Sequence, residues 1–160
     1  MDRALAAGTD LVVAHCSAVG RYLERRARVP VLMDFSVPQP QRGTAFGYVL
    51  PDDEFTGLVE YTQFSQDVLA PRAYDDALAA YLVERWGSGG VPGTYTVEGI
   101  EDGVIPMTDA VFSRRAGNRI YRIGTAGGAT RPSTGYAFAT MQRQATVMAR
   151  GILAGRRPLP

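Results

Sequence analysis

The side chain that most clearly suggests a chemical role is Glu60, a carboxyl group in the middle of an apolar, β-prone run. Alternation along a strand would place Leu58, Glu60 and Thr62 on one face. If that face is buried, the charged carboxylate is penalised, and a carboxylic acid kept neutral at pH 7 can donate a proton. If the run is an edge strand with Glu60 in water, the residue needs no special role. The residues alone leave both interpretations open.

A second candidate site is the glycine-rich run from Gly124 to Gly135, which lies between a predicted strand over 120–123 and a long predicted helix. Small residues let a backbone approach a ligand closely, and a helix start offers unpaired N–H groups with a partial positive charge. Such a site suits a phosphate or the carbonyl edge of a flavin. The alternative is a loop that only turns the chain. The G-x-G-x-x-G fingerprint of a dinucleotide-binding turn occurs neither here nor elsewhere in the sequence.

Other reactive side chains give weaker signals. His15 and Cys16 are the only histidine and cysteine, so the sequence contains no Cys/His zinc cluster and no pair for an internal disulfide, and we expect no metal site. Asp34 ends a strand-like run and is either a capping residue or a site group. A cluster of four arginines is most typical of a solvated face. These are Arg114, Arg115, Arg119 and Arg122.

Composition excludes several classes of function. The 160 residues fit one domain, and 46% hydrophobic residues allow a buried core. All seventeen basic residues are arginine, which excludes a catalytic lysine and the Walker P-loop, and a net charge of +1 predicts no nucleic-acid partner. No apolar run approaches the roughly 18–20 residues of a membrane span, and residues 1–4 do not resemble a signal peptide, so we expect a cytoplasmic location.

The predicted elements that must position these residues are a mixture of strands and helices. Residues 46–50 and 58–62 predict an antiparallel hairpin around a turn at 51–57, and 31–35 and 95–100 predict further strands. Residues 17–28 predict a helix, a second helix begins at Pro71 with Tyr74 and Tyr81 in the core, and a third spans about 136–154. The third helix carries a stripe that we expect to be buried, formed by Phe138, Met141, Ala145, Met148 and Ile152. This order is not a βαβ alternation and indicates an α+β fold or the substrate half of an α/β enzyme.

Several strings together resemble the lycopene cyclase family of FAD-dependent carotenoid enzymes, in family order from about residue 31 onward. The most specific is Tyr-Arg-Ile-Gly-Thr-Ala-Gly-Gly-Ala-Thr-Arg-Pro-Ser-Thr-Gly-Tyr at 121–136, followed by Phe-Ala-Thr-Met-Gln-Arg-Gln at 138–144. Leu-Met-Asp-Phe at 32–35, Phe-Gly-Tyr-Val-Leu-Pro at 46–51 and Gly-Val-Ile-Pro-Met-Thr at 103–108 resemble further family segments. Leu-Val-Glu-Tyr-Thr at 58–62 resembles the string that plant members write F-L-E-E-T, with Tyr61 at the position of the second acid.

The resemblance implies the C-terminal, substrate-binding half of a two-domain flavoprotein over residues 31–160. It leaves residues 1–30 unplaced, and it implies that the N-terminal Rossmann unit of the family is absent from this sequence. A separately encoded N-terminal half is then an expected partner, and we expect this chain alone not to hold FAD tightly.

The implied reaction is a non-redox cyclisation that converts the linear ends of lycopene to β-rings, the work of an isomerase. A proton is added to the terminal alkene, the cation closes the ring, and a proton leaves. The resemblance makes Glu60 the acid, with Phe46, Tyr48 and Leu58 along the polyene channel. It implies reduced FAD, with NAD(P)H as the reductant, held by Gly124, Thr125, Ala126, Gly127, Gly128, Thr134 and Gly135.

A linear carotenoid dissolves in lipid, so the resemblance also implies peripheral contact with a membrane. Two alternatives remain open from the residues. One is the half-site of a generic flavin-dependent oxidoreductase, and the other is a non-catalytic remnant that binds an apolar ligand.

Overall fold

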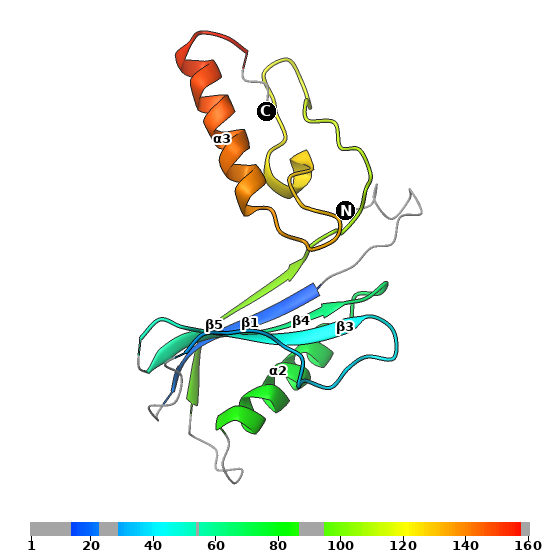
Figure 1. The fold of residues 1–160 in the computed structure, drawn as a ribbon, viewed down its shortest axis with the longest axis vertical. Helices are drawn as coiled ribbons and strands as arrows, with labels where there is room; N and C mark the ends of the chain where they lie inside the picture. The colour runs from blue at the N-terminus through cyan, green and yellow to red at the C-terminus, as the bar shows by residue number, and fades with distance from the viewer. Residues whose placement is uncertain (1–13, 23–28, 54, 87–94, 158–160) are drawn as a thin grey trace. The chain divides into compact units, whose positions relative to one another are not determined.

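The computed structural model describes residues 14–22, 29–53, 55–86 and 95–157 of the chain (Figure 1). The chain divides into two compact units. The first comprises Val12–Val104, and the second includes Ile105–Pro160. The predicted end of the Pro71 helix in the glycines at 87–90 and the second half of the predicted 17–28 helix lie outside the described residues.

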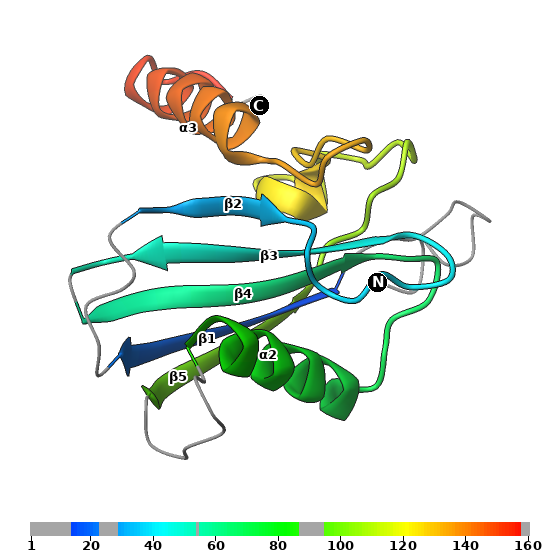
Figure 2. The same cartoon turned by 60° about the horizontal axis from the view of Figure 1, so that its bottom comes forward.

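A five-stranded antiparallel sheet forms the first unit, in the order β2-β3-β4-β1-β5 (Figure 2). The strands are β1 (Ala14–Tyr22), β2 (Val31–Asp34), β3 (Thr44–Pro51), β4 (Thr56–Phe64) and β5 (Tyr95–Val104). Together with the two long helices, this sheet makes the chain α+β, one of the two classes that the sequence predicts.

The predicted hairpin is present as β3 and β4, paired from Thr44↔Phe64 to Pro51↔Gly57. Its turn is held by Asp53, whose Oδ1 accepts hydrogen bonds from the amides of Phe55 and Thr56, each at 2.6 Å. An aspartate that bonds backbone amides two and three residues on is a local turn signal. This explains why the sequence predicts the hairpin correctly.

Helix α2 (Pro71–Trp86) begins at the predicted proline and covers one face of the sheet, as Figure 2 shows. The residues that it buries recur at helical spacing. They are Tyr74, Leu78, Tyr81 and Leu82, and they pack with Val37, Ala45, Val49, Val59 and Tyr61 of the sheet side. This cluster is the core of the first unit, and it confirms the predicted burial of Tyr74 and Tyr81.

Strand alternation then fixes the two faces of β4. Val59 and Tyr61 belong to the core beneath α2, so Leu58, Glu60 and Thr62 occupy the face away from the helix. This is the shared face that the sequence predicts for these three residues.

The predicted helix over 17–28 is wrong where the structure describes it. Residues 14–22 form β1, which pairs with β4 from Ala14↔Gln63 to Arg21↔Thr56 and with β5 on its other side. Pairing with two neighbours overrides the weak local helical pattern of this segment.

The second unit contains little regular structure before its helix α3 (Phe138–Leu153). The predicted strand over 120–123 is wrong: this stretch contributes one isolated bridge, Arg115↔Tyr121, because no described strand lies beside it to extend the ladder. A short 3-10 helix, η1 (Gly124–Gly127), follows, and α3 begins two residues later than predicted. Gly155 ends α3 with a left-handed φ of 64°.

The predicted buried stripe of α3 is also wrong. Phe138 is 76% exposed and Ile152 is 62% exposed, and the buried residue of the helix is Gln144. The periodicity identifies an apolar face correctly, but periodicity does not say whether anything covers that face.

Candidate functional site

Glu60 lies half-buried near the middle of β4, between Tyr48 of β3 and Ser17 of β1 in the strand register. The hydroxyl of buried Thr62 donates a short hydrogen bond to Glu60 Oε1. This bond orients one of the two carboxyl oxygens of Glu60. The structure therefore holds Glu60 on a rigid strand in a defined orientation.

Aromatic rings lie on the same sheet face as this carboxyl, and Tyr48 is paired with Glu60 in the strand register. Phe46 packs edge-to-face against Tyr48, Phe64 and Phe35, with ring centroids 5.4, 5.3 and 5.8 Å apart. Phe46 itself is 3% exposed, whereas Tyr48 and Leu58 are half-buried. The face thus combines one fixed acid with electron-rich rings, and aromatic faces attract cations.

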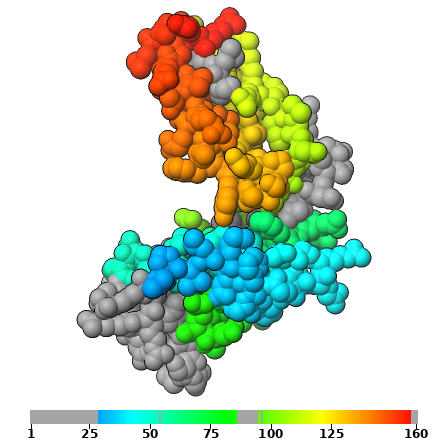
Figure 3. All heavy atoms as spheres, viewed as in Figure 1, coloured from blue at the N-terminus to red at the C-terminus, as the bar shows by residue number. Residues whose placement is uncertain are grey.

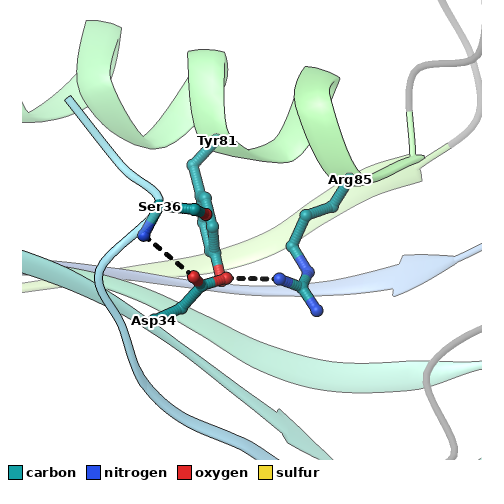
Figure 4. A network of polar contacts seen from close by, with 4 residues as sticks. All are labelled: Asp34, Ser36, Tyr81 and Arg85. Atoms are coloured by element: carbon teal, nitrogen blue, oxygen red, sulfur yellow. Dashed lines mark hydrogen bonds and ion pairs between the residues drawn. The ribbon is translucent and has the colours of Figure 1, made fainter.

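Asp34 lies on the other side of the sheet, under α2, where it joins two elements (Figure 4). Tyr81 donates a hydrogen bond of 2.8 Å to Asp34 Oδ2, and Arg85 forms an ion pair with the same oxygen. The amide of Ser36 donates to Oδ1 at 3.0 Å. Because Met33 has a positive φ of 53° and β2 changes register beside it, the backbone turns the carboxyl toward the helix.

The electrostatics of this cluster keep Asp34 ionised. Burial by itself raises the pKa of Asp34, but hydrogen bonds from Ser36 and Tyr81 and the charge of Arg85 bring the pKa below its usual value. Burial, followed by the hydrogen bond to Asp34, raises the pKa of Tyr81. A carboxylate held in this way connects β2 to α2 and is a poor proton donor.

In the second unit, the predicted cofactor residues Gly124, Thr125, Ala126, Gly127 and Gly128 form a tight turn. The amides of Gly127, Gly128 and Ala129 donate to the carbonyls of Ile123, Thr125 and Gly124. A Cβ on Gly127 would lie 2.4 Å from the Arg122 carbonyl oxygen. Glycine is required there so that the backbone can fold onto itself.

Gln144 ties this turn to α3. Its Oε1 accepts a hydrogen bond from the Gly124 amide at 3.3 Å, and its side chain is 5% exposed. Its Nε2 is buried and has no hydrogen-bond partner among the described residues. Sequence reasoning missed Gln144, although a glutamine beside an apolar stripe of a helix is a visible signal of a buried polar contact.

A pocket of about 320 Å³ lies at the start of α3. It is lined by Arg131, Thr134, Tyr136, Phe138, Ala139 and Thr140. The helix begins without a side-chain cap, so the first amides of α3 keep their hydrogen-bonding capacity and partial positive charge. Together with the Arg131 guanidinium, this gives a site suited to an anionic or carbonyl group.

The structure therefore distributes the predicted site residues over two units. Glu60, Phe46, Tyr48 and Leu58 belong to the first, and all seven predicted cofactor residues belong to the second. Of those seven, Thr134 lines the pocket, whereas Gly135 has a left-handed φ of 72° beside Met107 and Ile105. The side chains of His15 and Cys16 lie outside the description.

Over residues 14–22, 29–53, 55–86 and 95–157, no three His, Cys, Asp or Glu side chains gather as a metal site would require. Within the same residues, none of the helices has the length and apolarity needed to cross a bilayer.

These features define an α+β protein with an acid on an aromatic sheet face and a separate glycine-rich unit. The family model described as lycopene cyclase protein matches residues 17–158, nearly the whole sequence, so the chain belongs to the lycopene cyclase family. Searches of curated proteins and of solved structures gave no match. Family membership supports a lycopene cyclase-like role in carotenoid biosynthesis.

Proposed function

We propose that this chain provides the substrate-binding half of a lycopene cyclase, with Glu60 as the general acid. The observation that carries the proposal is the position of Glu60 on a family-matched sheet, on the face away from α2 and beside an aromatic cluster. The reaction needs a proton donor, an apolar surface for the polyene, and stabilisation of a carbocation without water.

Each requirement has a counterpart among the described residues. Glu60 Oε2 donates the proton to the terminal alkene of the linear carotenoid while Thr62 keeps Oε1 in place. The positive charge that appears on the substrate carbon lies over the half-buried ring of Tyr48, which attracts cations. The cation closes the ring, and loss of a proton completes an isomerisation with no net redox change.

The cofactor proposed for this chemistry is reduced FAD. The pocket at the start of α3 fits part of such a molecule, because Arg131, the Thr134 and Thr140 hydroxyls and the first amides of the helix are hydrogen-bond donors. Its volume of about 320 Å³ is at the low end for small-molecule sites, which span about 300–1,000 Å³. We therefore propose that a dinucleotide-binding module, encoded separately or elsewhere in a longer protein, provides the remaining contacts. Bound reduced flavin would supply negative charge for the reaction.

The test of the acid is Glu60→Gln, which keeps the shape of the side chain and removes its proton. The chain is produced in a lycopene-accumulating bacterium, fused to the dinucleotide-binding domain of a lycopene cyclase, and β-carotene is measured by chromatography. General acid catalysis contributes about 10²–10⁴-fold, so the variant should lose product formation by at least about a hundredfold.

Glu101→Gln is the matched control, because Glu101 is an exposed glutamate on β5 of the same sheet. It should cyclise at the parental rate, with both variants equal in protein level and in flavin content. Near-parental cyclisation by Glu60→Gln would show that another group is the acid. If the parental fusion binds the carotenoid but does not cyclise it, the non-catalytic binding function would be favoured instead.

A further inference from the structure

The loop between β2 and β3 carries an exposed aromatic ring onto the sheet face that bears Glu60. Phe35 is 52% exposed, and its ring packs edge-to-face on Phe46, with centroids 5.8 Å apart. Phe46 in turn packs on Tyr48, the residue paired with Glu60 in the strand register. In the space-filling view, the blue atoms of residues 29–40 belong to the outer surface of the first unit (Figure 3). The three rings therefore form a row that begins beside the acid and ends at a half-exposed phenylalanine.

One side chain, Gln39, holds this loop in place. Its Nε2 donates hydrogen bonds to the carbonyl oxygens of Phe35, Val37 and Ala45 at 3.2, 3.0 and 2.8 Å. Its Oε1 accepts a hydrogen bond from the Ala45 amide at 3.0 Å. The side-chain amide thus pairs with the start of β3 as the backbone of a neighbouring strand would. Through the bond to its carbonyl, Phe35 is attached to the same anchor.

The loop is also anchored in the core. Val37 is 2% exposed and belongs to the cluster beneath α2, and Pro38 and Pro40 flank Gln39. Each proline fixes one backbone torsion, so the loop has less freedom to lose when it folds. These anchors hold Phe35 in a defined place without burying it. An aromatic side chain that is positioned in this way and left half in solvent is suited to contact a ligand.

A linear carotenoid whose end lies at Glu60 can extend in two directions along β3. One direction passes Phe46 toward Phe35, and the other passes Leu50, which is 41% exposed near the end of the same strand. The first direction offers consecutive aromatic rings with centroids 5.4 and 5.8 Å apart. Large rings give more dispersion contact with a hydrocarbon than one leucine does. The row of rings therefore favours the direction toward Phe35.

We propose that Phe35 binds the polyene chain beyond its reacting end, and that Gln39 is the positioning residue that holds Phe35 there. The inference rests on the proposed function, because it takes the carotenoid and the place of its reacting end from the role of Glu60. It adds the direction in which the rest of the molecule leaves the acid. Glu60 acts on the end group, whereas Phe35 acts on binding, so the two residues affect different steps.

The experiment measures lycopene binding and cyclisation by the fusion protein and its variants. Lycopene is supplied in detergent micelles, and the amount retained by the immobilised protein is measured by absorbance. Burial of the exposed half of a phenyl ring improves binding by about three- to tenfold. Phe35→Ala should therefore weaken lycopene binding and raise KM by about three- to tenfold, with kcat close to that of the parent.

Gln39→Met tests the positioning role, because it keeps the length of the side chain and removes its hydrogen bonds. It should raise KM to a similar extent although Phe35 is intact, and exchange of the Ala45 amide should accelerate because its acceptor is lost. The double variant should bind no more weakly than Phe35→Ala alone, because Gln39 acts through Phe35. A purely structural role of Gln39 would add its own effect and lower kcat as well.

Phe55→Ala is the matched control, because Phe55 is a similarly exposed phenylalanine, at 45%, in the β3–β4 turn. It should bind and cyclise lycopene like the parent. Phe35→Tyr keeps the ring and should also bind like the parent. Urea unfolding should show that every variant keeps the first unit folded.

Binding requires no turnover, so a failure of cyclisation and a failure of this inference are separate results. Equal lycopene binding by Phe35→Ala and the parent would overturn the inference and leave the role of Glu60 untouched. Weaker binding by Leu50→Ala than by Phe35→Ala would show that the chain extends in the opposite direction. A parental fusion that neither binds nor cyclises lycopene would overturn the inference together with the proposed function.

Discussion

Gly47→Ala tests the packing that joins α2 to the sheet. A Cβ at this position would lie 2.5 Å from Tyr81 Cζ and 2.9 Å from its hydroxyl. Tyr81 is 2% exposed and hydrogen-bonded to Asp34, so its ring has no free space into which to move. Overpacking costs about 1–3 kcal/mol, and a hydrogen bond to a charged group contributes about 1.5–3 kcal/mol. If the ring shift breaks part of that bond, the variant should lose about 2–4 kcal/mol of unfolding free energy.

The matched control is Gly99→Ala on β5, where a Cβ would have no atom within 4 Å. Without a clash, replacing glycine by alanine stabilises a protein by about 0.4–1 kcal/mol through the unfolded state. Urea unfolding at constant m-value gives both free energies, and hydrogen exchange of the β3 and β4 amides reports on the first unit alone. A difference between the two variants of less than about 0.5 kcal/mol would refute this account of the Tyr81 packing.

Two further predictions concern Asp34 and the glycine-rich turn. The folded-state pKa of Asp34 lies below the usual value of 3.8, so its stabilising effect is complete above the unfolded pKa and is lost as the pH falls through the folded value. Asp34→Asn should therefore be less stable than the parent in urea at pH 7, and the deficit should shrink below about pH 4; a deficit independent of pH would contradict this. Gly127→Ala places a Cβ 2.4 Å from the Arg122 carbonyl oxygen and should abolish hydrogen-exchange protection of the Gly128 and Ala129 amides. Gly155→Ala, at an open left-handed position, should cost only about 1–2 kcal/mol and leave that protection intact, and equal effects of the two variants would argue against a close-packed turn.

Local signals account for the parts of the fold that the sequence predicts. Asp53 specifies the β3–β4 turn through bonds to amides two and three residues away, and Pro71 starts α2 at its favoured position. The tyrosines at 74 and 81 belong to one helical face, and their burial follows from that spacing. Each of these features is readable within a window of a few residues.

The missed features depend on contacts between distant residues. Asp34 meets Tyr81 and Arg85 across 47 and 51 positions of sequence, so nothing near Asp34 indicates that it is an ion-paired carboxylate. A spacing of four residues places Tyr81 and Arg85 on one face of the helix, but it does not name their partner. The exposure of Phe138 and Ile152 likewise depends on what lies opposite α3, which the stripe itself cannot specify.

The position of β1 between β4 and β5 affects how the chain can fold while the ribosome is synthesising it. Residues 14–22 leave the ribosome before both of the strands that will flank them, because β4 ends at Phe64 and β5 ends at Val104. The β2-β3-β4 meander can assemble from neighbouring segments, whereas β1 must wait for its second partner until β5 has been made. Until then, the nascent chain exposes an unpaired strand edge, which is the kind of surface that promotes misassociation. Completion of this sheet is therefore a late, cooperative event that depends on synthesis of β5.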